Sequence, residues 1–240
     1  MSVNLGNTSI GSLYLGSTKV GAAYLGNVKV WEAGLPAKTV RFDFHYDNFD
    51  PTTLTDYGGI GATWTHVEDD VYDFYFNDTD WGARTWSHLR GETSSLFRTY
   101  SSTKTDRPFR THSFDILDAN LEGVTNVRML LNPTMLGLQS IASIRNTSSV
   151  TNFNRFLQSD TGSAITSIPL FDTSSAVDVS YMFYGTGNVE TGALAMYTQM
   201  STQTNPPTNY SDCFTNCGSN TVTGAAELAQ IPTSWGGTMA

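Results

Sequence analysis

The chain has 240 residues, of which 39% are hydrophobic and 12% aromatic, so it has enough apolar side chains to form a core and is predicted to be globular. Its net charge is −9, and it has no cluster of Lys and Arg, which argues against nucleic acid as a partner. No apolar window is long enough to cross a bilayer, and residues 1–20 lack the pattern of a secretory signal. We therefore expect neither nucleic-acid binding nor membrane insertion.

A ten-residue repeat occupies the first 31 residues. Each copy begins with Leu-Gly, with an apolar residue five positions on, and an aromatic side chain ends the copy. Short strands joined by tight, glycine-containing turns fit this period. A module this small buries little surface alone, so we predict that residues 1–35 attach the protein to other copies or to a scaffold. The predicted anchoring residues are Leu5, Gly6, Ile10, Tyr14, Leu15, Gly16, Val20, Tyr24, Leu25, Gly26, Val30 and Trp31.

The next segment, residues 36–120, is aromatic and predicted to be a small β domain. Residues 39–46 alternate apolar and polar side chains, as a half-buried strand does. Residues 62–67 and 71–76 flank the acidic residues 68–70, which predicts a hairpin. Residues 114–117 are expected to begin the first coil of the following region.

A second repeat has a period of 26 residues. Residues 147–157 align with residues 173–183, and a degenerate copy covers residues 124–131. A fixed period of this length predicts a solenoid over residues 121–185, in which each coil has a short strand, a turn and a brief helical stretch such as residues 179–183. Six equivalent positions should point into its core: Val127, Phe153, Val179, Leu130, Phe156 and Met182.

The last segment, residues 186–240, is predicted to cap the solenoid. Residues 189–197 and 223–230 have helical character, and Pro232 ends the second stretch. Cys213 and Cys217 lie four residues apart and are expected to be reduced and buried. The predicted fold class is therefore β-rich with short helices: a stacked β module, a small β domain, and a short solenoid with a helical cap.

Candidate catalytic chemistry rests on acidic residues near aromatic ones, at residues 43–47, 68–70 and 77–81. Two carboxylates could serve a glycosidase, and Asp78 with Asp80 could bind calcium. However, these residues stand where turns are expected, and no spacing defines an acid and nucleophile pair. His66, His88 and His112 have no identifiable partner for a catalytic triad. The predicted catalytic, cofactor and metal residues are accordingly none.

The phrase from Phe171 to Ser175, followed by Tyr181-Met182-Phe183-Tyr184, resembles the BspA-like leucine-rich repeats of bacterial surface proteins. The likeness covers about residues 120–220. It departs from the family at Gly185-Thr186-Gly187, where the repeats usually end in Gly-Cys. The ten-residue phrase resembles one found at the start of structural proteins of tailed bacteriophages from gut bacteria. These resemblances imply a virion protein assembled in the host cytoplasm.

The first hypothesis is a non-enzymatic virion surface protein. Residues 1–35 would bind other phage virion proteins on the tail, neck or capsid, and the leucine-rich repeats would contact a host surface or mucosal glycan or protein. An anchor that cannot bury itself favours a homo-oligomer. The alternatives are a capsid or tail decoration or fibre protein that only stabilises the particle, and a tail-associated polysaccharide hydrolase.

Overall fold

The computed structural model describes most of the chain outside residues 81–112. The described residues are 4–5, 8–9, 13–15, 18–20, 22–25, 28–32, 34–44, 50–53, 62–76, 79–80, 113–131, 138–159 and 164–239, and up to residue 32 the description concerns the backbone. The chain divides into two compact units, Met1–Pro36 and Ala37–Ala240. Both are β-rich, and the second also contains short helices.

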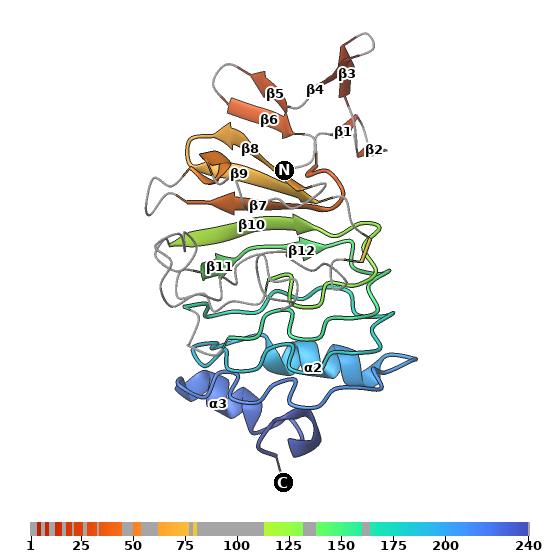
Figure 1. Ribbon diagram of the computed structural model, residues 1–240, viewed down its shortest axis with the longest axis vertical. Coiled ribbons are helices and arrows are strands. Elements are labelled where there is room, and N and C mark those ends of the chain that lie inside the picture. The colour runs from red at the N-terminus through yellow and green to blue at the C-terminus, as the bar shows by residue number, and fades with distance from the viewer. Residues whose placement is uncertain are drawn as a thin grey trace. The chain divides into compact units, whose positions relative to one another are not determined.

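The first unit consists of three separate two-stranded hairpins, one for each copy of the ten-residue repeat (Figure 1). The strands are β1 Asn4–Leu5, β2 Thr8–Ser9, β3 Leu13–Leu15, β4 Thr18–Val20, β5 Ala22–Leu25 and β6 Val28–Glu32. The innermost pairs are Leu5 with Thr8, Leu15 with Thr18, and Leu25 with Val28. Each pair is separated in sequence by two residues, the first of which is a glycine.

The second unit begins with a six-stranded mixed sheet in the order β11-β10-β7-β9-β8, with β12 also paired to β10. Its strands are β7 Thr39–Asp43, β8 Ala62–Glu68, β9 Val71–Phe76, β10 Phe114–Asn120, β11 Leu138–Ile141 and β12 Ile144–Arg145. The predicted β8–β9 hairpin is confirmed. β10 pairs antiparallel with β7 but parallel with β11 and β12, so the sheet changes from antiparallel to parallel at this strand.

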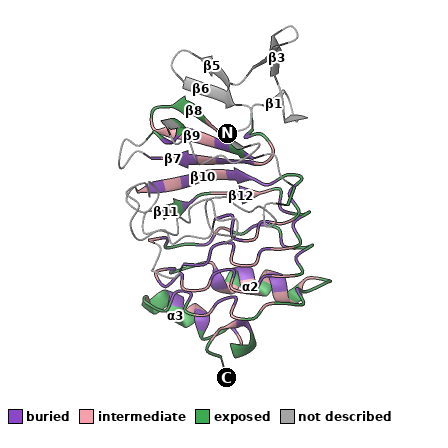
Figure 2. Cartoon of the chain, in the orientation of Figure 1, coloured by how far each residue is buried: buried purple, intermediate pink, exposed green. Residues whose placement is uncertain are grey.

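Period-two alternation places most aromatic side chains of β7, β9 and β10 on the buried face of the sheet, whereas Tyr75 on β9 is exposed. Phe42, Phe74 and Phe114 are fully buried, and the rings of Phe42 and Phe114 meet at a centroid distance of 5.8 Å. On the opposite face, the Arg41 guanidinium pairs with the Asp73 carboxylate at 2.7 Å. Figure 2 shows the resulting alternation of buried and partly exposed residues along β7 and β10.

Beyond the sheet, successive segments of backbone are hydrogen-bonded in parallel across the opposite side of the core. Isolated parallel bridges join Asn126 to Asn152, Asn152 to Asp178, and Asp178 to Asn209. The amide of Phe153 donates to the carbonyl of Asp178 at 2.8 Å, and further bonds of this kind connect neighbouring segments. We call this arrangement the backbone ladder; its segments are 125–131, 151–157, 177–183 and 208–214.

The brief helix expected at residues 179–183 is absent, and that prediction was wrong. This stretch is a turn, and Tyr181 has a left-handed backbone with φ 56°. Met129 and Arg155, 26 residues apart, have nearly the same conformation, with φ 59° and 56°. The Tyr181 amide donates to the carbonyl of Ser211, in the next ladder segment. A right-handed helix needs the opposite φ and an acceptor four residues back, so the ladder geometry excludes it.

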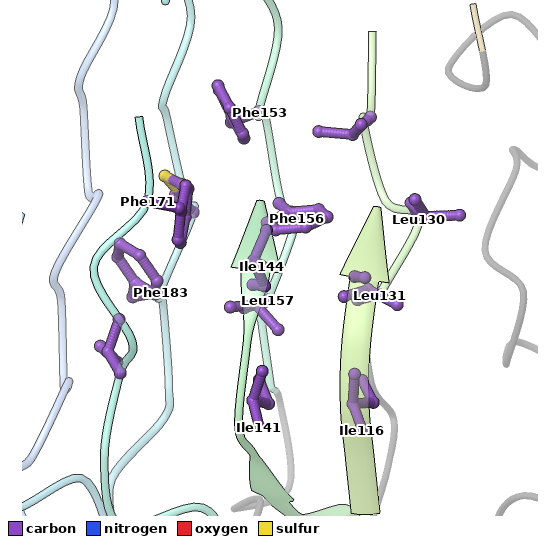
Figure 3. Packing of buried hydrophobic residues seen from close by; sticks show 14 of the residues in the cluster. Ile116, Leu130, Leu131, Ile141, Ile144, Phe153, Phe156, Leu157, Phe171 and Phe183 are labelled. Carbon is purple, nitrogen blue, oxygen red and sulfur yellow. The ribbon is translucent and has the colours of Figure 1, made fainter. Parts of the chain in front are cut away.

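The inward positions predicted from the 26-residue period are confirmed, because all six side chains are fully buried. They are Val127, Leu130, Phe153, Phe156, Val179 and Met182. Figure 3 shows side chains from the ladder, from β10 and from β11–β12 converging on one interior. The ring of Phe156 meets Phe153 edge-on at 5.7 Å and Phe171 at 6.1 Å. Packing across neighbouring segments thus makes a continuous core.

The two predicted helices are present with different bounds. α2 is Ala193–Thr202 and α3 is Val222–Leu228. α2 begins four residues later than expected, because Gly192 precedes it with φ 101°, and a Cβ there would lie 2.3 Å from the Ile168 carbonyl oxygen. Short 3-10 turns are η1 Pro51–Thr53 and η3 Thr233–Trp235. Trp235 stacks on Tyr210 with ring centroids 4.3 Å apart, which covers the last ladder segment.

Candidate functional site

Eight of the twelve predicted anchoring residues lie on the strands of the first unit. They are Leu5, Tyr14, Leu15, Val20, Tyr24, Leu25, Val30 and Trp31. The other four, Gly6, Ile10, Gly16 and Gly26, lie outside the described residues. The register pairs Leu13 with Val20 and Tyr14 with Lys19, so the apolar pair and the Tyr–Lys pair alternate along β3 and β4.

Two of the acidic segments have described residues on neighbouring strands: Asp43 pairs with Val71, next to Asp70, and the Phe44 amide donates to the Asp70 carbonyl oxygen at 2.9 Å. Glu68, Asp69 and Asp70 form the end of β8 and its turn, where the carbonyl oxygen of Asp69 lies 2.8 Å from Nε2 of His66. Asp80 is bridged to Asn126 at the start of the backbone ladder. Asp47, Asp78, His88 and His112 lie outside the described residues. Among the residues that are described, no three His, Cys, Asp or Glu side chains are grouped to bind a metal ion.

The two cysteines are free and fully buried, in agreement with the sequence expectation. Burial, followed by the charge of Cys217, raises the pKa of the Cys213 thiol well above its ordinary value. Burial also raises the pKa of Cys217 to about 12, against a partial offset from a hydrogen bond to Thr186. A nucleophilic or metal-binding cysteine needs an accessible thiolate, and both environments disfavour that form.

The outer side of the backbone ladder carries a continuous series of polar contacts. Arg128 Nε donates to Asn154 Oδ1 at 3.1 Å, and Asn154 Nδ2 donates to Ser180 Oγ at 2.7 Å. Asn152 Oδ1 and Asp178 Oδ1 accept from the amides two residues on, at 2.9 Å each. These contacts occupy polar groups of successive segments and fix their register.

Next to this series lies a group that we call the Arg155 cluster: Arg155, Gln158, Tyr181 and Tyr184. The Arg155 guanidinium carbon lies 4.6 Å from the centroid of the Tyr181 ring, a cation–π contact. Arg155 Nη1 donates to Gln158 Oε1 at 2.8 Å. The rings of Tyr181 and Tyr184 are 5.7 Å apart. Arg155, Tyr181 and Tyr184 are all partly exposed, so the cluster lies at the surface with the Tyr181 ring against the guanidinium.

The Arg155 cluster was not predicted, although the 26-residue period of the sequence contains the necessary signal. At the 26-residue spacing, Arg155 aligns with Tyr181, so any parallel stacking of the two copies places these side chains side by side. The alignment does not show whether the side chains of Arg155 and Tyr181 are exposed. Only the ladder geometry turns both side chains to the outside of the core.

Comparisons of the chain with protein-family models, characterised proteins and solved structures find no match. Within the described residues, neither helix has the length and apolar character needed to cross a membrane.

Proposed function

We propose that the chain is a non-enzymatic structural protein of a bacteriophage virion. Residues 1–35 anchor it to the tail, neck or capsid, and the remainder displays a BspA-like leucine-rich-repeat solenoid that adheres to a host or mucosal surface. The observation that carries the proposal is that the two repeats lie in different compact units of the chain. A separate compact unit holds one hairpin per ten-residue repeat, and the second unit holds parallel backbone contacts at a 26-residue spacing.

The anchoring role is supported by the size of the hairpins. Each is a two-stranded sheet, and an isolated pair of strands is at best marginally stable in water. Packing of the apolar repeat positions against a second protein, or against further copies of the chain, would supply the missing burial. Repetition on a particle also makes weak surface contacts effective through avidity, so adhesion needs no deep pocket.

The test follows the chain in assembled particles. Changing Leu5, Leu15 and Leu25 together to Asp places a charge in every hairpin, and we expect the protein to be lost from purified virions. Thr8→Ser with Thr18→Ser is the matched control and should leave incorporation unchanged. Cryo-electron microscopy of wild-type particles should show residues 1–35 buried against another virion protein. Incorporation of the Leu→Asp variant at the wild-type level would refute the anchoring role.

Adhesion is tested separately, by the binding of intact particles to host cells. Particles that carry the chain should bind more strongly than particles that lack it. If the repeat region is itself buried between virion subunits, the protein serves as a decoration or cement protein. Equal binding with and without the chain would lead to the same conclusion.

A further inference from the structure

We propose that the Arg155 cluster binds the carboxylate of an acidic sugar at the end of a host or mucosal glycan. This inference rests on the proposed adhesive function and names its ligand class. It starts from the charge distribution. The chain has a net charge of −9, and residues 156–240 contain no Lys, Arg or His. Arg155 is therefore the last basic residue, and six Asp or Glu follow it, so the long-range charge repels an anion and binding must come from short-range contacts with the Arg155 guanidinium.

The guanidinium of Arg155 is available for such an anion. Arg41 and Arg145 form ion pairs with Asp73 and Asp118. Arg155, in contrast, has no carboxylate partner among the described residues; its contacts are the Gln158 amide oxygen and the face of the Tyr181 ring. These contacts hold the planar group in place without neutralising it. A preorganised guanidinium binds a carboxylate through two parallel hydrogen bonds.

The surroundings favour a sugar over a peptide as carrier of the carboxylate. Extended peptides commonly bind by adding a strand to exposed backbone groups. In the ladder, the amides of Arg155, Leu157 and Tyr181 already donate to the next segment. A ligand must therefore use side chains. Tyr181 and Tyr184 offer ring surface with a polar end, which suits the apolar and hydroxyl-bearing faces of a sugar ring.

Positions 155 and 181 share a left-handed backbone with Met129, whose side chain is buried, so this conformation recurs in the ladder and does not by itself expose a side chain. Both residues have φ 56°, while their neighbours Phe156 and Met182 are fully buried. The conformation costs free energy for a residue with a side chain, and glycine would adopt it more easily. Arg and Tyr at these positions therefore contribute through their side chains and not through backbone preference.

The experiment measures binding of the full chain to a polymer bearing 3′-sialyllactose, and to the same polymer bearing lactose. The two differ only by the acidic sugar. We expect binding to the sialylated polymer and at least tenfold weaker binding to lactose. Because charge-assisted hydrogen bonds are among the strong ones, Arg155→Gln should reduce binding to the sialylated polymer by about tenfold or more. Tyr184→Ala should reduce it by a smaller factor.

The matched control is Arg145→Gln, which also removes one positive charge but from a pair with Asp118 on the sheet. It should bind like the wild type, and circular dichroism checks that each variant is folded. Three results would overturn the proposal: no binding of the wild type, equal binding of Arg155→Gln and wild type, or equal binding of poly-L-glutamate and the sialylated polymer. Equal binding of the two polymers would indicate that the cluster binds an acidic peptide or any anion, without preference for a sugar.

Failure of this proposal can be separated from failure of the proposed function. If particles carrying Arg155→Gln bind host cells like wild-type particles, adhesion stands and uses another surface. If wild-type particles bind no better than particles lacking the chain, adhesion itself is refuted. The polymer assay therefore tests the ligand of the Arg155 cluster, and the cell assay tests adhesion of the particle.

Discussion

Replacing Phe156 with Ala should strongly destabilise the second unit, because this side chain connects ladder segments through the core. Phe156 is fully buried and contacts the rings of Phe153 and Phe171. A buried Phe removes about 150–250 Å² from water, and about 25 cal/mol per Å² gives an upper estimate of about 4–6 kcal/mol. Alanine retains part of this area, but the cavity adds a penalty, and core Phe→Ala changes cost about 3–5 kcal/mol.

The assay is equilibrium unfolding in urea, followed by circular dichroism. With a slope of about 2–3 kcal/mol per molar urea, a loss of about 4 kcal/mol lowers the midpoint by roughly 1.3–2 M. The control is Val177→Ala in the neighbouring ladder segment. Val177 is 52% exposed, and its truncation should change the free energy of unfolding by less than about 0.5 kcal/mol. A Phe156→Ala variant within about 1 kcal/mol of the wild type would refute the continuous core.

Three further predictions concern other features of the second unit. Gly224→Ala should lower the melting temperature markedly, because the added Cβ would lie 2.1 Å from the Val189 carbonyl oxygen. The matched change is Gly123→Ala, whose Cβ would meet nothing closer than 3.7 Å. This change should cost only about 1 kcal/mol of backbone strain. The free energy of unfolding should fall as pH rises from 9 toward 12, because the raised pKa values of Cys213 and Cys217 make both thiols ionise first in the unfolded chain. Cys217→Ala should remove the Cys217 part of this dependence and leave that of Cys213, and an unchanged slope would contradict the assignment. Arg145→Gln should cost at most about 1 kcal/mol by urea unfolding, because Arg145 and Asp118 are 35% and 23% exposed; a larger loss would show that the pair is structurally essential.

The sequence by itself determined the features that depend on local pattern. Period-two alternation identified β8 and β9 and the turn between them. The 26-residue period identified buried positions, such as Phe153 and Phe156. Helical pattern located α2 and α3, although Gly192 shifted the start of α2 through a close approach to another segment.

Only the tertiary structure decided which distant segments pair. β7 pairs with β10 across more than 70 residues of chain, and β10 then changes from antiparallel to parallel pairing. Alternation tells which face of a strand is buried but not which strand lies beside it, because many pairings satisfy the same pattern. The same holds for the Arg155 cluster. The alignment placed Arg155 opposite Tyr181, but their contact depends on the left-handed turns and backbone hydrogen bonds between segments, which no local pattern specifies.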